Sequence, residues 1–248
     1  AIETEKVLQK ECWKTKKPAV AAIGTSGEKV SLISGIVNDG GRIAARSGGG
    51  AVMGSKKLKA VVLAGSKIIS CADPATMKAI SKDLSKKIRK ASLPVKGGVF
   101  PLMGAVMGLM KRALPMDGMM VGMLMKQWGT ISNNTLGITM GDTPLKNWKG
   151  SVKDYNYSYY KSMNPEKIMK IEKKKYHCYS CVIGCGGIVE IAKATNGEFT
   201  HTHKPEYETM TTFGGLVMNK NLNAILYINE LLNRAGMDSI SAGGTVAF

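Results

Sequence analysis

Three cysteines within eight residues constrain the fold of this sequence more than any other feature. Cys178, Cys181 and Cys185 form a C-x2-C-x3-C arrangement, and Gly184 and Gly186 flank the third cysteine. Thiolates this close in sequence can surround one compact soft centre, and the glycines allow backbone amides to approach the sulfur atoms. Soft thiolate ligation favours an iron–sulfur cluster or zinc. We therefore expect a short loop that folds around a metal.

The spacing of the cysteines does not decide between these two centres, and both need a fourth ligand. Cys12 and Cys71 are distant in sequence, whereas three histidines lie nearer and would suit zinc. These are His177, His201 and His203. Three unligated cysteines at the end of a basic helix are the remaining alternative, although free cysteines rarely cluster so closely. Five cysteines in 248 residues are too few for a disulfide scaffold.

A second motif, rich in glycine and arginine, occupies residues 40–56. Its glycines permit positive φ, so successive N–H groups can converge on an anion, and Arg42, Arg46 and Lys56 add charge suited to phosphate. The Gly-Ser-Lys order at its end differs from a P-loop, and about four residues before the next expected strand are too few for a Rossmann helix. Phosphate binding and a glycine-rich turn with solvated basic residues are about equally compatible with this motif.

The periodicity of apolar residues changes from strand-like to helix-like near residue 70, which predicts a domain boundary there. Before it we expect an opening helix from Ile2, strands over 18–23, 29–37 and 59–65, and a turn at 25–27. After it, Asp73 and Pro74 predict the start of a helix with Met77, Ile80, Leu84 and Ile88 on one face. A basic helix over 165–175 and a helix over 222–232 that ends before Gly236 follow, and Ser241 is expected to begin another.

Composition limits the class of protein. The hydrophobic and charged fractions, 44% and 21%, are typical of a packed soluble chain and exclude wholesale disorder, and the formal net charge is +17. The longest apolar run, from Gly98 to Met110, is shorter than the roughly 18–20 residues that span a bilayer. No signal peptide opens the chain, so we expect a cytoplasmic protein. Both ends fall within helical patterns, so we expect a fragment of a longer protein.

Six segments together resemble the aldehyde ferredoxin oxidoreductase family of tungsten- or molybdenum-pterin enzymes, in the order in which that family has them. Besides the cysteine motif, the segments that carry the resemblance are Ala22-Ile-Gly-x-x-Gly-Glu28, Asn38-Asp-Gly40, Arg46 through Gly50-Ala-Val-Met-Gly-Ser-Lys-x-Leu-Lys-Ala60, Pro205-Glu-Tyr-Glu208 and Gly236-Met-Asp-Ser-Ile-Ser241. They span nearly the whole chain, and only residues 91–130 lack a good counterpart. The resemblance implies an α+β fold. Residues 1–70 would be the C-terminal portion of a β-rich pterin-binding domain, and residues 71–248 the start of a mainly α-helical domain.

The resemblance also implies how the glycine–arginine motif would act. Arg42 and Arg46 match the family's basic residues at the pterin phosphates, and the carbonyl of Ile43 matches one offered to the Mg²⁺ that bridges them. Three glycines complete this cradle, namely Gly48, Gly49 and Gly50. Asn233 and Asp238 match the ends of the family's Asp-x-x-Gly-Leu-Asp pterin motif, and Asn233 can still hydrogen-bond the pterin without the charge assistance of a carboxylate.

For the cysteines the resemblance implies a [4Fe–4S] cluster beside the pterin, held by Cys178, Cys181 and Cys185, with the fourth cysteine beyond Phe248. Glu208 matches an acidic residue near the metal that exchanges protons with substrate. Tyr227 replaces a glutamate that binds iron at a dimer interface in some members, and the family allows a homodimer or a larger complex. The implied reaction oxidises a small aldehyde to a carboxylic acid at a tungsten or molybdenum bis-pterin centre. Its electrons pass to ferredoxin, which a basic surface would steer.

Two other functions stay open at this stage. One is a reductive member of the same family, the catalytic subunit of a larger complex that acts on an aromatic acyl-CoA thioester. The other is a zinc-stabilised, basic nucleic-acid-binding module, although aromatic residues make up only 6% and are not interleaved with the basic ones. We therefore expect neither a nucleic-acid partner nor a membrane span, and we expect the chain by itself not to turn over aldehyde.

Overall fold

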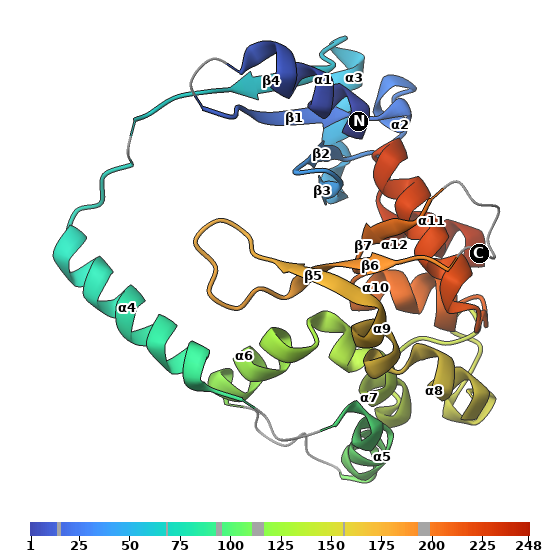
Figure 1. The fold of residues 1–248 in the computed structure, drawn as a ribbon. Coiled ribbons are helices and arrows are strands. Elements are labelled where there is room, and N and C mark those ends of the chain that lie inside the picture. Colours follow the sequence, from blue (N-terminus) through green and yellow to red (C-terminus); the bar gives the residue numbers. More distant parts are fainter. Residues whose placement is uncertain (14–15, 68, 93–95, 111–116, 156, 193–198) are drawn as a thin grey trace. The chain divides into compact units, whose positions relative to one another are not determined.

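The computed structural model describes residues 1–248 except 14–15, 68, 93–95, 111–116, 156 and 193–198 (Figure 1). The chain forms two compact units. The first unit contains residues 1–68, 226–246 and 248, and the second contains residues 69–225 and 247. Helices and strands occur in both, which confirms the expected α+β class. Within the described residues, no helix is long and apolar enough to cross a membrane.

An antiparallel sheet organises the first unit. Its strands, in the order β3-β2-β1-β4, are Arg42–Ala44, Ile36–Asn38, Ala19–Ile23 and Ala60–Leu63. Val20, Ala22 and Val37 are buried, and Ala22 pairs with Val37 across β1 and β2. The opening helix α1 (Ile2–Cys12) contacts β1 and buries Ile2 and Glu5. The short helices α2 (Thr25–Glu28) and α3 (Gly49–Ser55) contact each other.

The strand expected over 29–37 is wrong for most of its length. Only Ile36–Asn38 forms β2, and the expected turn at 25–27 belongs to helix α2. Serine side chains and a positive φ account for the difference, because they offer the backbone local partners instead of a ladder. Ser34 Oγ donates to Ser31 O at 2.6 Å, and Val30 has φ +56°.

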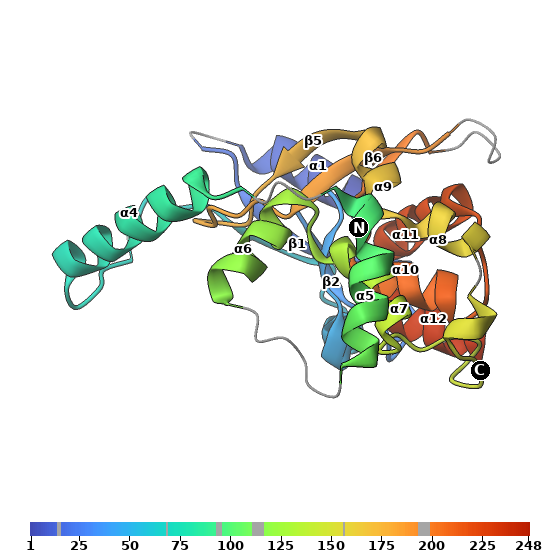
Figure 2. The same ribbon diagram turned by 90° about the horizontal axis from the view of Figure 1, so that it is seen from below.

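The second unit is mainly helical and carries a small sheet of three antiparallel strands, β5 to β7 in sequence order. The strands are Glu172–Tyr176, Gly186–Glu190 and His201–His203. The helices are α4 (Pro74–Lys90), α5 (Phe100–Leu109), α6 (Gly118–Gln127), α7 (Asn133–Met140), α8 (Tyr157–Met163), α9 (Pro165–Ile171) and α10 (Tyr207–Met210). Helix α5 packs against α7 (Figure 2), and Phe100 and Trp128 meet edge to face in the core with ring centroids 4.9 Å apart.

The sequence signals for the ends of helices are confirmed in two places and are wrong in two others. Asp73 Oδ1 accepts from Thr76 N at 3.0 Å and caps α4, as predicted, and Gly236 follows the last residue of α11 (Leu222–Ala235). The basic helix expected to reach residue 175 ends at Ile171, because the following residues pair with β6. The last helix, α12 (Ser239–Ala247), is capped by Asp238 and not by Ser241.

Candidate functional site

The cysteine motif occupies the loop of a β-hairpin in the second unit. Strands β5 and β6 pair through Tyr176 and Gly186, so the loop between them carries all three cysteines and extends beyond the sheet (Figure 1). A turn closes its first part, where Cys181 N donates to Cys178 O at 3.0 Å. Ser180 and Gly184 have positive φ, +56° and +64°. The short spacing therefore folds into a tight loop, as the cluster expectation requires.

The charges of the other two cysteines act on the Cys185 thiol. All three cysteines are free; Cys178 is exposed, and Cys181 and Cys185 are partly buried. Burial raises the pKa of the Cys185 thiol, and the nearby charges of Glu206, Cys178 and Cys181 raise it further. Three thiolates gathered here would repel one another, so a cationic centre would stabilise them.

The fit of the loop to a metal depends on its donor chemistry. Within the part of the chain that the structure describes, no three His, Cys, Asp or Glu side chains are already arranged to hold a metal ion. The donor set of three soft thiols in one loop nevertheless suits an iron–sulfur cluster or zinc. The residues present therefore fit such a centre chemically, and its binding would draw the thiols together.

The three histidines proposed as a fourth ligand for zinc each have a polar partner, and His201 Nδ1 lies 2.9 Å from the Thr200 hydroxyl. His177 Nδ1 lies 2.9 Å from Cys181 O, and His203 Nδ1 lies 2.8 Å from the Tyr176 hydroxyl. A Cβ on Gly184 would lie 2.3 Å from the His177 ring. The glycine therefore makes room for that ring, a packing role, whereas the sequence suggested only an approach of amides to sulfur. The contacts of His177 and His203 engage one ring nitrogen, Nδ1, of each of these two histidines and orient their rings.

A buried ion pair that the sequence patterns did not predict anchors the hairpin. Lys204 Nζ lies 3.0 Å from Glu172 Oε1, and their side chains are 3% and 7% exposed. Lys204 N also donates to Gly187 O at 2.7 Å, and a Cβ on Gly187 would lie 1.9 Å from Glu172 Oε1. The lone glutamate in an otherwise basic run was the one available signal.

Glu208 is exposed on α10, close in sequence to groups that face the cysteine loop. Glu206, the N-cap of α10, acts on the charge of Cys185, and its carboxylate accepts from the Thr130 hydroxyl. A buried π-helical turn, Thr211–Gly215, follows α10 directly. Such turns are frequent at functional sites. The second unit therefore places Glu208 on a short helix whose first turn lies near Cys185.

The glycine–arginine motif forms β3, a single turn and α3 in the first unit. Arg42 and Ile43 lie on β3, and an Arg42 guanidinium nitrogen is 3.8 Å from a carboxylate oxygen of Asp39. Gly48, with φ +68°, precedes Gly49 and Gly50 at the start of α3. The positive φ that a glycine-rich cradle requires is therefore present.

The fold joins this motif to the predicted pterin motif near the other end of the chain. Arg46 Nε lies 3.7 Å from Asp238 Oδ2, with Asp238 2% and Arg46 64% exposed. Backbone bonds hold the segments together, since Asp238 N donates to Ile33 O at 2.8 Å and Gly35 N to Gly236 O at 2.8 Å. Asn233 is also buried in this unit. The candidate pterin residues therefore lie in the first unit, and the cysteines and Glu208 lie in the second.

Comparison with known proteins adds independent evidence. The family model described as "Aldehyde ferredoxin oxidoreductase, N-terminal domain" matches residues 1–65, and that for domains 2 and 3 matches residues 110–248. The tungsten-containing aldehyde ferredoxin oxidoreductase of Pyrococcus furiosus is 33% identical over 99% of this chain and 34% of its own length. The enzyme of that name from Thermococcus kodakarensis is 31% identical over the same shares.

A more distant relative and a solved structure agree with these matches. A P. furiosus protein named aliphatic sulfonate oxidoreductase, WOR-like subunit, is 24% identical over 98% of the chain. The active-site complex BamBC of benzoyl coenzyme A reductase, solved with 1,5-dienoyl-CoA, has the same fold, with a TM-score of 0.68 and 24% identity. This chain spans about a third of the length of the relatives it matches. With both family models placed in order along it, the chain belongs to the aldehyde ferredoxin oxidoreductase family of oxidoreductases.

Proposed function

We propose that this chain forms the cofactor-binding part of an oxidoreductase that converts a small aldehyde to a carboxylic acid and passes the electrons to ferredoxin. The observation that carries the proposal is the three-cysteine hairpin loop in a chain that both family models match. When bound, a tungsten or molybdenum bis-pterin supplies the two-electron oxidation, and a [4Fe–4S] cluster supplies single-electron transfer. The rest of the proposal concerns what this chain's own residues do.

The cysteine loop would hold the cluster. Cys178, Cys181 and Cys185 supply three thiolates, which leaves one ligand to be provided by another residue. Partial burial raises the pKa of the Cys185 thiol, and bonding to a cationic centre would offset this cost to its thiolate. Solvent exposure and hydrogen bonds to sulfur set the potential of such a centre, so the exposed Cys178 and the part-buried Cys185 would affect it differently.

The first unit would hold the pterin. Arg42 and Arg46 would bind the pterin phosphates, the carbonyl of Ile43 would face the bridging Mg²⁺, and the glycines would bring N–H groups close to the anion. Asn233 would hydrogen-bond the pterin amino groups. Asp238 would orient Arg46, because its carboxylate is fixed by the first turn of α12.

Glu208 would act on the protons of the substrate. The exposed Glu208 carboxylate would take a proton from the hydrated substrate and release it to water.

We place the protein in the cytoplasm, as a homodimer or in a larger complex. The domain division at residue 70 also stays a prediction; the compact units differ from it in that residues 226–246 belong with the first.

Anaerobic reduction of benzyl viologen by the holoenzyme with aldehyde tests the proposal. Glu208→Gln is expected to lower kcat about 100-fold, because general acid–base catalysis contributes roughly that much. Cys181→Ser is expected to abolish turnover, whereas Cys71→Ser, at an exposed cysteine outside the loop, is the matched control and should be silent. A fully loaded holoenzyme with no aldehyde-dependent reduction would refute the proposal.

A further inference from the structure

Lysines line the segment that leads into the cysteine loop. Helices α8 and α9 and strand β5 follow one another, and the loop follows β5 directly. Six lysines of this region, which we name the lysine track, belong to the second unit. They are Lys161, Lys167, Lys170, Lys173, Lys174 and Lys175. All six residues are exposed, and the Lys175 ammonium donates to the carbonyl oxygens of Lys126 and Gln127 at 2.6 and 3.3 Å.

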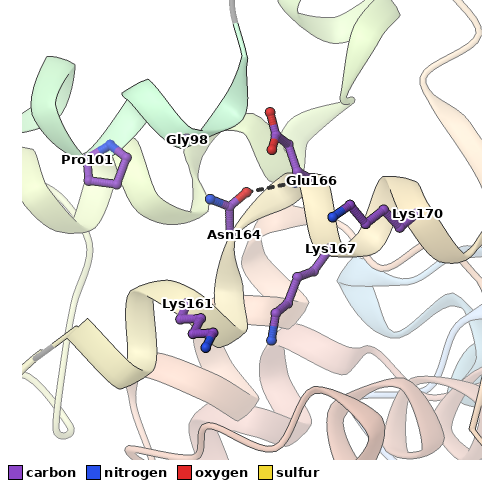
Figure 3. Close-up of a pocket in the computed structure, with 7 residues that line it drawn as sticks. All are labelled: Gly98, Pro101, Lys161, Asn164, Glu166, Lys167 and Lys170. Atoms are coloured by element: carbon purple, nitrogen blue, oxygen red, sulfur yellow. Dashed lines mark hydrogen bonds between the residues drawn. The ribbon is translucent and has the colours of Figure 1, made fainter.

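A pocket of about 410 Å³ opens at the start of the track. Seven residues line the pocket (Figure 3): Gly98, Pro101, Lys161, Asn164, Glu166, Lys167 and Lys170. The Asn164 side chain is occupied, because its oxygen accepts from Glu166 N at 2.8 Å. Figure 3 shows Glu166 and Lys167 extending from neighbouring positions in different directions. The pocket therefore presents three ammonium groups and a single carboxylate.

Little of this positive charge is neutralised by the protein itself. Glu190 pairs with Lys173 at 2.6 Å, and Glu172 is buried against Lys204. Among the described residues, no carboxylate forms an ion pair with the three lysines that line the pocket or with the lysine in the middle of β5. These lysines are Lys161, Lys167, Lys170 and Lys174. An unneutralised cluster of this kind attracts an acidic partner.

The strand of the lysine track is about as long as a small protein interface, and it leads directly to the exposed cysteine loop. Five residues of β5 span roughly 16 Å, a length that one interface of about 800 Å² per partner can cover. The loop is accessible at the end of the track, because Cys178 is exposed and Tyr179 is 96% exposed. Transient redox complexes use small, charged interfaces of this kind.

We propose that the lysine track is the docking surface for an acidic one-electron carrier protein, and that a carboxylate side chain of the carrier enters the pocket. The inference rests on the proposed function, since it names where that function's electron acceptor binds. Charge on the track would steer the carrier and orient it with its redox centre toward Cys178.

Charge reversal tests this surface. Lys167→Glu with Lys170→Glu is compared with Lys78→Glu and Lys82→Glu, two exposed lysines of α4 whose reversal changes the net charge equally. With an acidic ferredoxin as acceptor, the track variant is expected to raise the KM for ferredoxin about tenfold at low salt, because steering attraction becomes repulsion. The difference should shrink near 1 M salt, where the Debye length is about 3 Å. Equal effects of the two pairs would overturn the proposal.

Two further measurements separate this proposal from the proposed function. Turnover with benzyl viologen, a small dye that needs no docking, tests the aldehyde reaction alone and should be equal in both variants. Carbodiimide cross-linking of ferredoxin to the holoenzyme tests docking alone and should join carrier carboxylates to Lys167, Lys170 or Lys174. Cross-links confined to α4, or cross-links abolished by a single-stranded oligonucleotide but not by salt, would contradict the docking surface.

Discussion

Asp238 offers a quantitative test of how the first unit is held together. Its buried carboxylate accepts from Ile240 N at 3.2 Å and Ser241 N at 3.1 Å, and also from the Ser241 hydroxyl. Loss of an N-cap costs about 1 kcal/mol and up to about 2, and a lost bond to a charged group adds to this. Asp238→Ala should therefore lower the free energy of unfolding by about 2–3 kcal/mol.

The ion pair with Arg46 should matter much less to stability. Its atoms are 3.7 Å apart and the Arg46 side chain is 64% exposed, so the pair is worth about 0–1 kcal/mol. Arg46→Ala should cost no more than that. Asp238→Asn keeps one acceptor oxygen at the cap but replaces the other by an NH2 group, so it should cost about 1 kcal/mol, less than Asp238→Ala.

Urea unfolding of the cofactor-free protein measures all three variants. The account predicts that Asp238→Ala is the outlier and that the other two lie together near the parent protein. If Arg46→Ala were as damaging as Asp238→Ala, the ion pair and not the helix cap would hold this region, and the reasoning would be refuted.

Two further predictions concern close contacts and buried charge. Gly24→Ala should lower the free energy of unfolding in urea by about 1–3 kcal/mol, because the new Cβ would lie 2.2 Å from Ala235 O. Gly65→Ala is the matched control and should leave the urea midpoint unchanged, because nothing lies within 4 Å of its new Cβ. Lys204→Ala should cost about 3–5 kcal/mol in thermal unfolding, since it leaves Glu172 buried and unpaired, and the double variant Lys204→Met, Glu172→Leu should recover most of the loss. A Lys204→Ala variant as stable as the parent would show that the pair is not buried.

Signals confined to a few residues predicted the elements that depend on those residues alone. Asp73 followed by proline marks the start of α4, and Gly236 follows α11, because capping is a local interaction. Strand β5 could not be predicted in the same way. Its basic sequence suits a helix, but it pairs with β6 and places Glu172 against Lys204, a partner distant in sequence.

In the candidate site, too, the features that depend on neighbouring residues could be predicted, and those that depend on distant partners could not. The spacing of the cysteines was enough to predict one loop, and the structure places that loop in a hairpin. The contact of Arg46 with Asp238 could not be predicted from spacing, because it depends on how the ends of the first unit pack. The polar partners of His177 and His203 were equally invisible, since they follow from the fold of the hairpin.

The metal content of the anaerobically purified holoenzyme tests the central claim most directly. The account predicts about four iron and four acid-labile sulfide per chain, together with tungsten or molybdenum and pterin, and an electron paramagnetic resonance signal of the reduced cluster that Cys181→Ser removes. A protein whose bound transition metal is zinc alone, with no sulfide and no pterin, would contradict it.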